Sequence, residues 1–244
     1  HMLKPFDKRV YATYDFMQHL IDICQRDARL IGEVKHKADE QVKQQTTFAL
    51  DWAVDELKYD TLTFKGYEAG HKTSGVSGLP RLYYDRNKPY TKTIRYYDNY
   101  KVTAFADKPV AYIIPQAWQK VIELFKLNNI VMHPLAHDTT LDLQMYYIGD
   151  FKTMQRPYEG HYLHSNVQLK PVDIKVKFYA GDYVVYTNQA LNRYIVETLE
   201  PQGVDSFFAW NFFDSVLGEK EYYSDYVFED DAAALLKKDP DLRK

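Results

Sequence analysis

Arginine, tyrosine and histidine side chains stand close together in the stretch RPYEGHYLH, between positions 156 and 164. A guanidinium group can donate paired hydrogen bonds to a carboxylate, and tyrosine and histidine can bond the hydroxyl groups of a sugar. We therefore predict a ligand-facing patch. It consists of Arg156, Tyr158, His161 and His164. The alternative is that this stretch only begins a strand and holds a histidine that is already hydrogen-bonded.

The eight histidines offer no recognisable zinc site. His133 and His137 are four positions apart, but Pro134 lies between them, and the facing geometry of such a pair requires a helix. His161 and His164 are three apart in a segment that we expect to be extended, which would place them on opposite faces. We predict no metal ligands in this chain.

Sequence motifs of common enzymes are also missing. The chain has no GxSxG nucleophile turn, no GxxxxGK[ST] phosphate loop and no GxGxxG turn. Its one cysteine, Cys24, excludes an internal disulfide bond, and its apolar helical setting predicts a buried side chain. We predict no catalytic residues, while an enzyme of an unrelated kind, built from scattered residues, stays an open alternative.

The composition narrows the class of protein. With 244 residues, 45% of them hydrophobic, the chain can bury a sizeable core. Its net charge of −3 gives no reason to expect nucleic acid as a partner. No stretch approaches the roughly 20 apolar residues of a membrane span. The 22 tyrosines suit half-buried sheet faces, with sugar or peptide binding as the alternative.

The elements that must position these residues divide the chain into three parts. Apolar positions from Phe6 to Cys24 recur at steps of three and four and predict an amphipathic helix, and a second helix is expected over 28–57. Residues 1–58 are therefore predicted to be helical. Residues 59–108 read as an extended, tyrosine-rich linking region on the surface of its neighbours.

The third part, residues 109–244, is predicted to be a mixed α/β domain. VAYII and IVMHPL read as strands that flank a helix, which predicts a βαβ unit with parallel strands. Trp118, Val121, Ile122 and Phe125 are expected to share one face of that helix. Ile174, Val176 and Phe178 alternate before an AGD turn and YVVY, which predicts a hairpin. The tail returns to helix in ALNRYIVETLEP, which ends at a proline, and in DSFFAWNFFDSVL. A last helix is expected in EDDAAALLKKDP, which has acids at its start and lysines at its end, as the helix dipole favours. The fold class expected for the whole chain is α+β.

Three stretches resemble bacterial zinc carboxypeptidases of the carboxypeptidase A-like superfamily. HMLKPFDKRVYATYDFM resembles the segment just past the catalytic glutamate of that family, which tends to read E-T-H-x-L-K-P-[YF]. VAYIIPQAWQKVIELFKLNNIVM and GDYVVYTNQALNRYIVETLEPQGVDSFFAWNFFDSVL are similar to the region that follows the catalytic domain in some members. The resemblance covers nearly the whole chain, and LEPQGVDSFFAWNFFD is its most specific part.

The resemblance implies that this chain starts just after the catalytic glutamate, with residues 1–27 as the last helix of a catalytic domain. His1 and Met2 are then either left by cleavage of a tag or part of a longer protein. The family holds zinc with a His-x-x-Glu pair and a distant histidine. No histidine here begins His-x-x-Glu, so zinc is expected in the parent protein and no cofactor in this chain.

A non-catalytic accessory region of a zinc carboxypeptidase is thus the expected function, and a stand-alone glycan- or peptide-binding module is the alternative. The expected partner is the upstream catalytic domain of the same polypeptide. Self-association through the apolar face of the first helix is also expected if that face is exposed. The resemblance implies a periplasmic or extracellular location.

Overall fold

The computed structural model of the chain describes residues 4–218 and 224–243, so His1 and Met2 lie outside the described part. The helices are α1 (Phe6–Arg26), α2 (Ala28–Gln44), α3 (Gln119–Leu127), α4 (Asn192–Leu199) and α5 (Asp225–Lys238), with 3-10 turns η1 (Asp214–Leu217) and η2 (Pro240–Arg243). The strands are β1 (Thr47–Val54), β2 (Asp60–Thr73), β3 (Pro80–Tyr96), β4 (Tyr100–Asp107), β5 (Ala111–Ile114), β6 (His133–Pro134), β7 (Thr139–Thr153), β8 (His164–Phe178) and β9 (Tyr183–Tyr186). Every strand pair among these residues is antiparallel, and the α+β class is confirmed.

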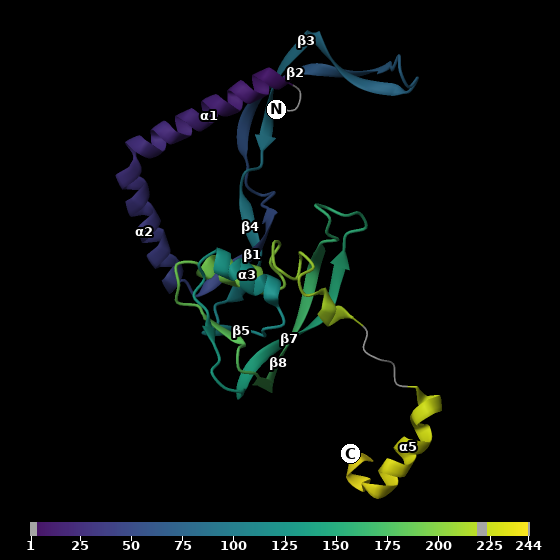
Figure 1. The fold of residues 1–244 in the computed structure, drawn as a ribbon. Coiled ribbons are helices and arrows are strands. Elements are labelled where there is room, and N and C mark those ends of the chain that lie inside the picture. The colour runs from purple at the N-terminus through teal and green to yellow at the C-terminus, as the bar shows by residue number, and fades with distance from the viewer. Residues whose placement is uncertain (1–3, 219–223, 244) are drawn as a thin grey trace.

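The main core lies between the three-stranded sheet β5–β9–β6 and the helices α3 and α4 (Figure 1). The buried apolar side chains of this core are Ile114, Val121, Ile122, Phe125, Ile130, Val185, Ile195 and Phe207. The predicted face of α3 is confirmed, because Val121, Ile122 and Phe125 are its buried residues. Asn129, with a φ of 56°, turns the chain out of the helix.

The order of strands in this sheet differs from the expected one. β5, α3 and β6 follow one another, and β5 and β6 run in the same direction because each is antiparallel to β9. They are not neighbours, however, since β9 lies between them. The predicted hairpin of β8 with β9 is also wrong, because β8 pairs with β7. The run YVVY suits a central strand, and its Val185 is fully buried.

The second predicted helix is shorter than expected. α2 ends at Gln44, and the residues that follow form β1, which pairs with β4. In TFALDWAV the alternate residues Phe48 and Leu50 are buried against Val196 of α4. An apolar period of two, with aromatic and branched residues, here favours a strand over a continued helix.

β2 and β3 form a long ribbon that extends away from the body of the molecule (Figure 1). Neither strand has a buried residue, so the expectation that this segment lies on its neighbours is wrong for β2 and β3. The two strands pair only with each other among the described strands, so the backbone groups on their inner edges are bonded and those on their outer edges are not paired with another strand. β4 does lie against a neighbouring segment as expected, since it pairs with β1.

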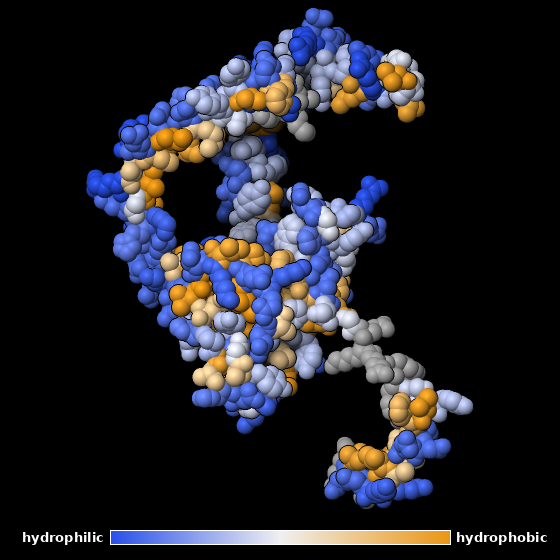
Figure 2. Space-filling model, viewed as in Figure 1, coloured by the Kyte–Doolittle hydropathy of each residue, from blue (hydrophilic) through white to orange (hydrophobic). Residues whose placement is uncertain are grey.

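α1 and α2 form an arch with no buried residue (Figure 1). Cys24 is exposed, and the prediction that it is buried is wrong because nothing among the described residues covers its helix face. In Figure 2 the apolar residues of the arch gather on the side that faces the opening toward β1 and β4. Among the described helices, none combines the length and the apolar character needed to cross a membrane.

The prediction that the aromatic segment DSFFAWNFFDSVL is a helix is wrong. The segment forms a series of turns that ends in η1. Asn211 has a φ of 66°, a left-handed conformation that interrupts any helix. Phe207 and Phe208 are buried all the same. The last predicted helix is confirmed as α5, with acidic residues early and Lys237 and Lys238 in its last turn.

Candidate functional site

The four residues predicted to face a ligand lie between the end of β7 and the start of β8. Tyr158 and His161 exchange both backbone hydrogen bonds, each 2.9 Å long. Between them, Glu159 and Gly160 have φ values of 50° and 80°, which makes a tight two-residue turn. Residues that oppose each other in this way point to the same side, so the structure brings these two side chains together.

Trp210 joins this pair from the aromatic segment after α4. The ring centroid of Trp210 lies 5.4 Å from that of His161, edge to face, and 6.3 Å from that of Tyr158. Its indole Nε1 donates a hydrogen bond of 3.1 Å to Oδ1 of Asp205. The sequence prediction missed Trp210 and Asp205, although the dense aromatic stretch that holds them was visible.

His164, the fourth predicted position, is buried, with 8% of its surface exposed. Its Nδ1 lies 2.9 Å from Oγ1 of Thr153. Its ring packs between those of Phe151, at 4.7 Å, and Phe208, at 5.1 Å. His164 therefore holds the end of the β7–β8 ribbon against the aromatic segment and does not face solvent. This agrees with the alternative interpretation, in which the stretch begins a strand and its histidine is already hydrogen-bonded.

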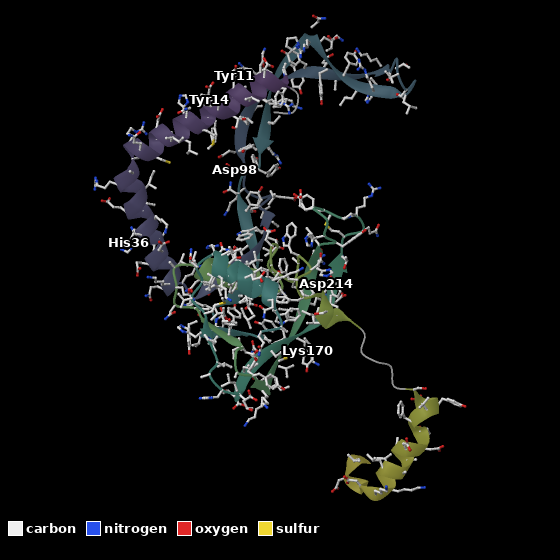
Figure 3. The ribbon with its side chains drawn as sticks, viewed as in Figure 1. Tyr11, Tyr14, His36, Asp98, Lys170 and Asp214 are labelled. Atoms are coloured by element: carbon white, nitrogen blue, oxygen red, sulfur yellow. The ribbon has the colours of Figure 1, made fainter. Side chains whose placement is uncertain are left out.

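The other ring nitrogen of His164 faces two groups of opposite character. Nε2 lies 3.1 Å from Oδ1 of Asp214, which accepts a hydrogen bond when ionised, and 3.2 Å from Nδ2 of Asn211, which can only donate one. A protonated Nε2 bonds Asp214, and an unprotonated one bonds Asn211. Asp214 itself is half exposed and lies at the edge of the body (Figure 3).

Arg156 is the predicted residue that the structure leaves apart. It is exposed, and no hydrogen bond or ion pair joins it to another described residue. The cluster that the tertiary structure assembles, which we call the Trp210 cluster, consists of Tyr158, His161, Trp210 and Asp205. Such a cluster can hold a ring or an apolar group and bond a hydroxyl, but it offers no activated nucleophile.

A zinc ion does not fit the described residues. Nowhere in 4–218 or 224–243 do three or more histidine, cysteine, aspartate or glutamate side chains come together as a metal would require. His164 and Asp214, whose Nε2 and Oδ1 atoms lie 3.1 Å apart, supply two donor groups where a zinc site needs at least three. We therefore derive no zinc-dependent step from this chain.

A buried acid, Glu200, lies at the end of α4. It is 3% exposed, and the hydroxyl of Tyr112 donates a hydrogen bond of 2.6 Å to its Oε1. Burial raises the pKa of Glu200, and the hydrogen bonds of Tyr112 and Tyr146 oppose that shift. Burial next to this carboxylate raises the pKa of Tyr112 as well, and that of Tyr146 to about 12. This trio links β5, β7 and α4, and we assign it a structural role.

Comparison with known proteins shows a limited likeness to carboxypeptidases. Over 100 residues, or 41% of this chain, it is 27% identical to Carboxypeptidase 2 of Trichophyton tonsurans, 26% to that of Trichophyton equinum and 25% to that of Trichophyton rubrum. The matched part spans 18% of the length of these relatives. No family model and no solved structure matches the chain. The chain thus contains a carboxypeptidase-related region.

Proposed function

We propose that this chain is a non-catalytic, C-terminal accessory region of a zinc metallocarboxypeptidase-like protein, which hydrolyses C-terminal peptide bonds. The likeness to Carboxypeptidase 2 supports the link to peptidases. The resemblance of the segments around α1, α3 and α4 supports the finer assignment. Under this proposal zinc and the catalytic glutamate belong to another part of the parent, which works outside the cytoplasm.

The observation that carries the proposal is the uncovered apolar stripe of α1. Phe6 is 73% exposed, Val10 48% and Met17 48%, and they recur along one face of a 21-residue helix. An apolar stripe of this kind normally packs against another layer. The resemblance assigns this helix to a catalytic domain, and the stripe is therefore where that domain would dock.

A hydrogen-exchange experiment tests this docking. This chain is compared with a longer polypeptide that also carries the preceding sequence of its gene, and the amides of α1 are expected to exchange at least ~10-fold more slowly in the longer protein. Val10→Lys places a charge in the stripe and should remove that protection. Ala12→Lys, on the opposite face of the same helix, is the matched control and should keep it.

The non-catalytic assignment has its own test. This chain is incubated with zinc and a peptide that has a free C-terminus, and both bound metal and released amino acid are measured. The longer polypeptide is expected to hydrolyse the peptide, while the chain alone should not. Stoichiometric zinc together with turnover by the chain alone would contradict the proposal.

The Trp210 cluster favours a second candidate function, the binding of a glycan or of a peptide C-terminus. Its rings are partly exposed, and Arg156 lies nearby in sequence with its guanidinium unpaired among the described residues. Titration with short peptides and glycans, followed by indole fluorescence, should give a saturable change that Arg156→Ala weakens. A flat titration for both ligand classes would leave the cluster with a structural role only.

A further inference from the structure

The β2–β3 ribbon is long for a sheet of only two strands. β2 has 14 residues and β3 has 17, whereas strands usually have three to ten. Neither pairs with any other strand of the described residues. An isolated two-stranded ribbon is only marginally stable in water, and three or more strands with an apolar face are the usual requirement. The ribbon therefore lacks something that a further strand would supply.

The two faces of the ribbon differ most in the half between Asp60 and Gly66. On one face Leu62 is paired with Ile94 and Phe64 with Lys92, and the ring of Phe64 lies 6.2 Å from that of Tyr90. The opposite face of this half carries threonine and basic side chains, namely Thr61, Thr63, Lys65, Thr91, Thr93 and Arg95.

The two edges of the ribbon are not equivalent. β3 contains Pro80 and Pro89, and its residues 86–88 have no partner on β2, which makes a bulge. Prolines and bulges are the features that keep a strand edge from pairing with another chain. β2 has no proline, and each of its residues from Asp60 to Thr73 is paired in unbroken succession. The outer edge of β2 is thus the open edge of the ribbon.

We propose that the open edge of β2 pairs with β2 of a second copy of this chain, giving a two-fold symmetric, four-stranded antiparallel sheet. In a symmetric dimer a single edge meets itself, so the same strand must be complementary to its own reversed sequence. The proposal is independent of the peptidase assignment, because it uses only the ribbon.

Charge and overlap together restrict the register of this pairing, since an axis at Gly70 would also place Glu68 opposite Lys72 but would leave residues 60–66 of β2 without partners. A two-fold axis at Lys65 or at Glu68 would place identical charges opposite each other, which is unfavourable. An axis at Gly66 instead places Asp60 opposite Lys72 of the second copy at both ends of the strand. Among the described residues Asp60 forms no ion pair, and the contact of the Lys72 amino group is with the ring of Tyr83, at 5.0 Å from its centroid. Both charges are therefore available for a second copy.

The association state of the full chain, measured by sedimentation equilibrium, tests the proposal. Wild type should dimerise with concentration. Asp60→Lys and Lys72→Asp should each weaken the dimer by about tenfold or more, because two attractive pairs become two repulsive ones. The matched control is Lys92→Asp on β3, the strand whose edge contains the prolines and the bulge. It makes the same charge change as Lys72→Asp and should leave the dimer intact.

Mixing the two variants gives the decisive result. A dimer of one Asp60→Lys copy with one Lys72→Asp copy has opposite charges at both ends, so the mixture should associate nearly as tightly as wild type. A misfolded variant could not be rescued in this way. A monomer at all concentrations, a dimer that is insensitive to both charge reversals, or a dimer lost through Val10→Lys in α1 would each overturn the proposal.

Discussion

The hydroxyl of Tyr112 lies 2.6 Å from Oε1 of Glu200 and donates a hydrogen bond to it. The two residues are 88 positions apart and join the first strand of the central sheet to the end of α4. A hydrogen bond to a carboxylate is stronger than one between neutral groups, and an unpaired buried carboxylate is costly. This contact therefore closes the main core on one side, and its two partners can be tested separately.

Glu200 should make the stability of the protein depend on pH in the acidic to neutral range. Burial raises the pKa of Glu200, so the folded state favours the neutral carboxyl group. The contribution of this group to the free energy of unfolding is therefore complete below pH ~4.5, and it is lost as the pH rises through the pKa of the folded state. Glu200→Gln cannot ionise and should remove that fall. Urea unfolding between pH 4 and 8 measures it, with Glu123→Gln on the exposed face of α3 as control. An unchanged pH profile would contradict the prediction.

Tyr112 should make the stability of the protein depend on pH in the alkaline range. Burial and the neighbouring carboxylate raise its pKa in the folded state, so its contribution is full below the unfolded value of about 10 and is lost above it. Tyr112→Phe should lower the free energy of unfolding at pH 7 by about 1–3 kcal/mol, because a hydrogen bond to a buried carboxylate is lost. The same variant should lose less stability between pH 10 and 12. Tyr226→Phe, 98% exposed, should behave as wild type throughout.

His164 should matter more for folding than its charged neighbour does. His164→Ala removes a buried ring packed between Phe151 and Phe208 and two hydrogen-bond positions, and we expect a loss of about 2–4 kcal/mol. Asp214→Asn keeps an oxygen acceptor at a half-exposed position and should cost at most about 1 kcal/mol. Chemical unfolding of both variants, followed by tryptophan fluorescence, compares them. Equal losses in the free energy of unfolding would contradict this prediction, because they would mean that the charge of Asp214 contributes as much as the packed ring of His164.

Replacing glycine by alanine should have opposite effects on stability at Gly203 and at Gly32. At Gly203 a Cβ atom would collide with the backbone carbonyl of Glu197 in α4, so Gly203→Ala should destabilise by about 1–3 kcal/mol or more. At Gly32, in the exposed helix α2, nothing lies within 4 Å of the added atom. Gly32→Ala should stabilise that helix by up to about 1 kcal/mol. Thermal unfolding and helical circular dichroism measure the pair, and a destabilising Gly32→Ala would indicate a contact on that face.

The sequence alone determined the elements whose periodicity is strong and local. The face of α3, the end of α4 before Pro201 and the polarity of α5 were predicted from apolar spacing and helix-end residues, because these depend on neighbours within a few positions. The same local reasoning failed for residues 47–54. We predicted a helix there, and the prediction was wrong because pairing with β4 favours the strand.

Tertiary structure alone decided which distant segments meet. The placement of β9 between β5 and β6, and the arrival of Trp210 beside Tyr158 and His161, depend on contacts between residues many positions apart. Two of the predicted ligand residues face Trp210, but His164 turns inward, because burial of its ring between two phenylalanines outweighs exposure. Sequence spacing fixes which face a side chain takes, whereas packing determines whether that face is covered. For the same reason the apolar stripe of α1 could be read from the sequence, and only the fold shows that no described residue covers it.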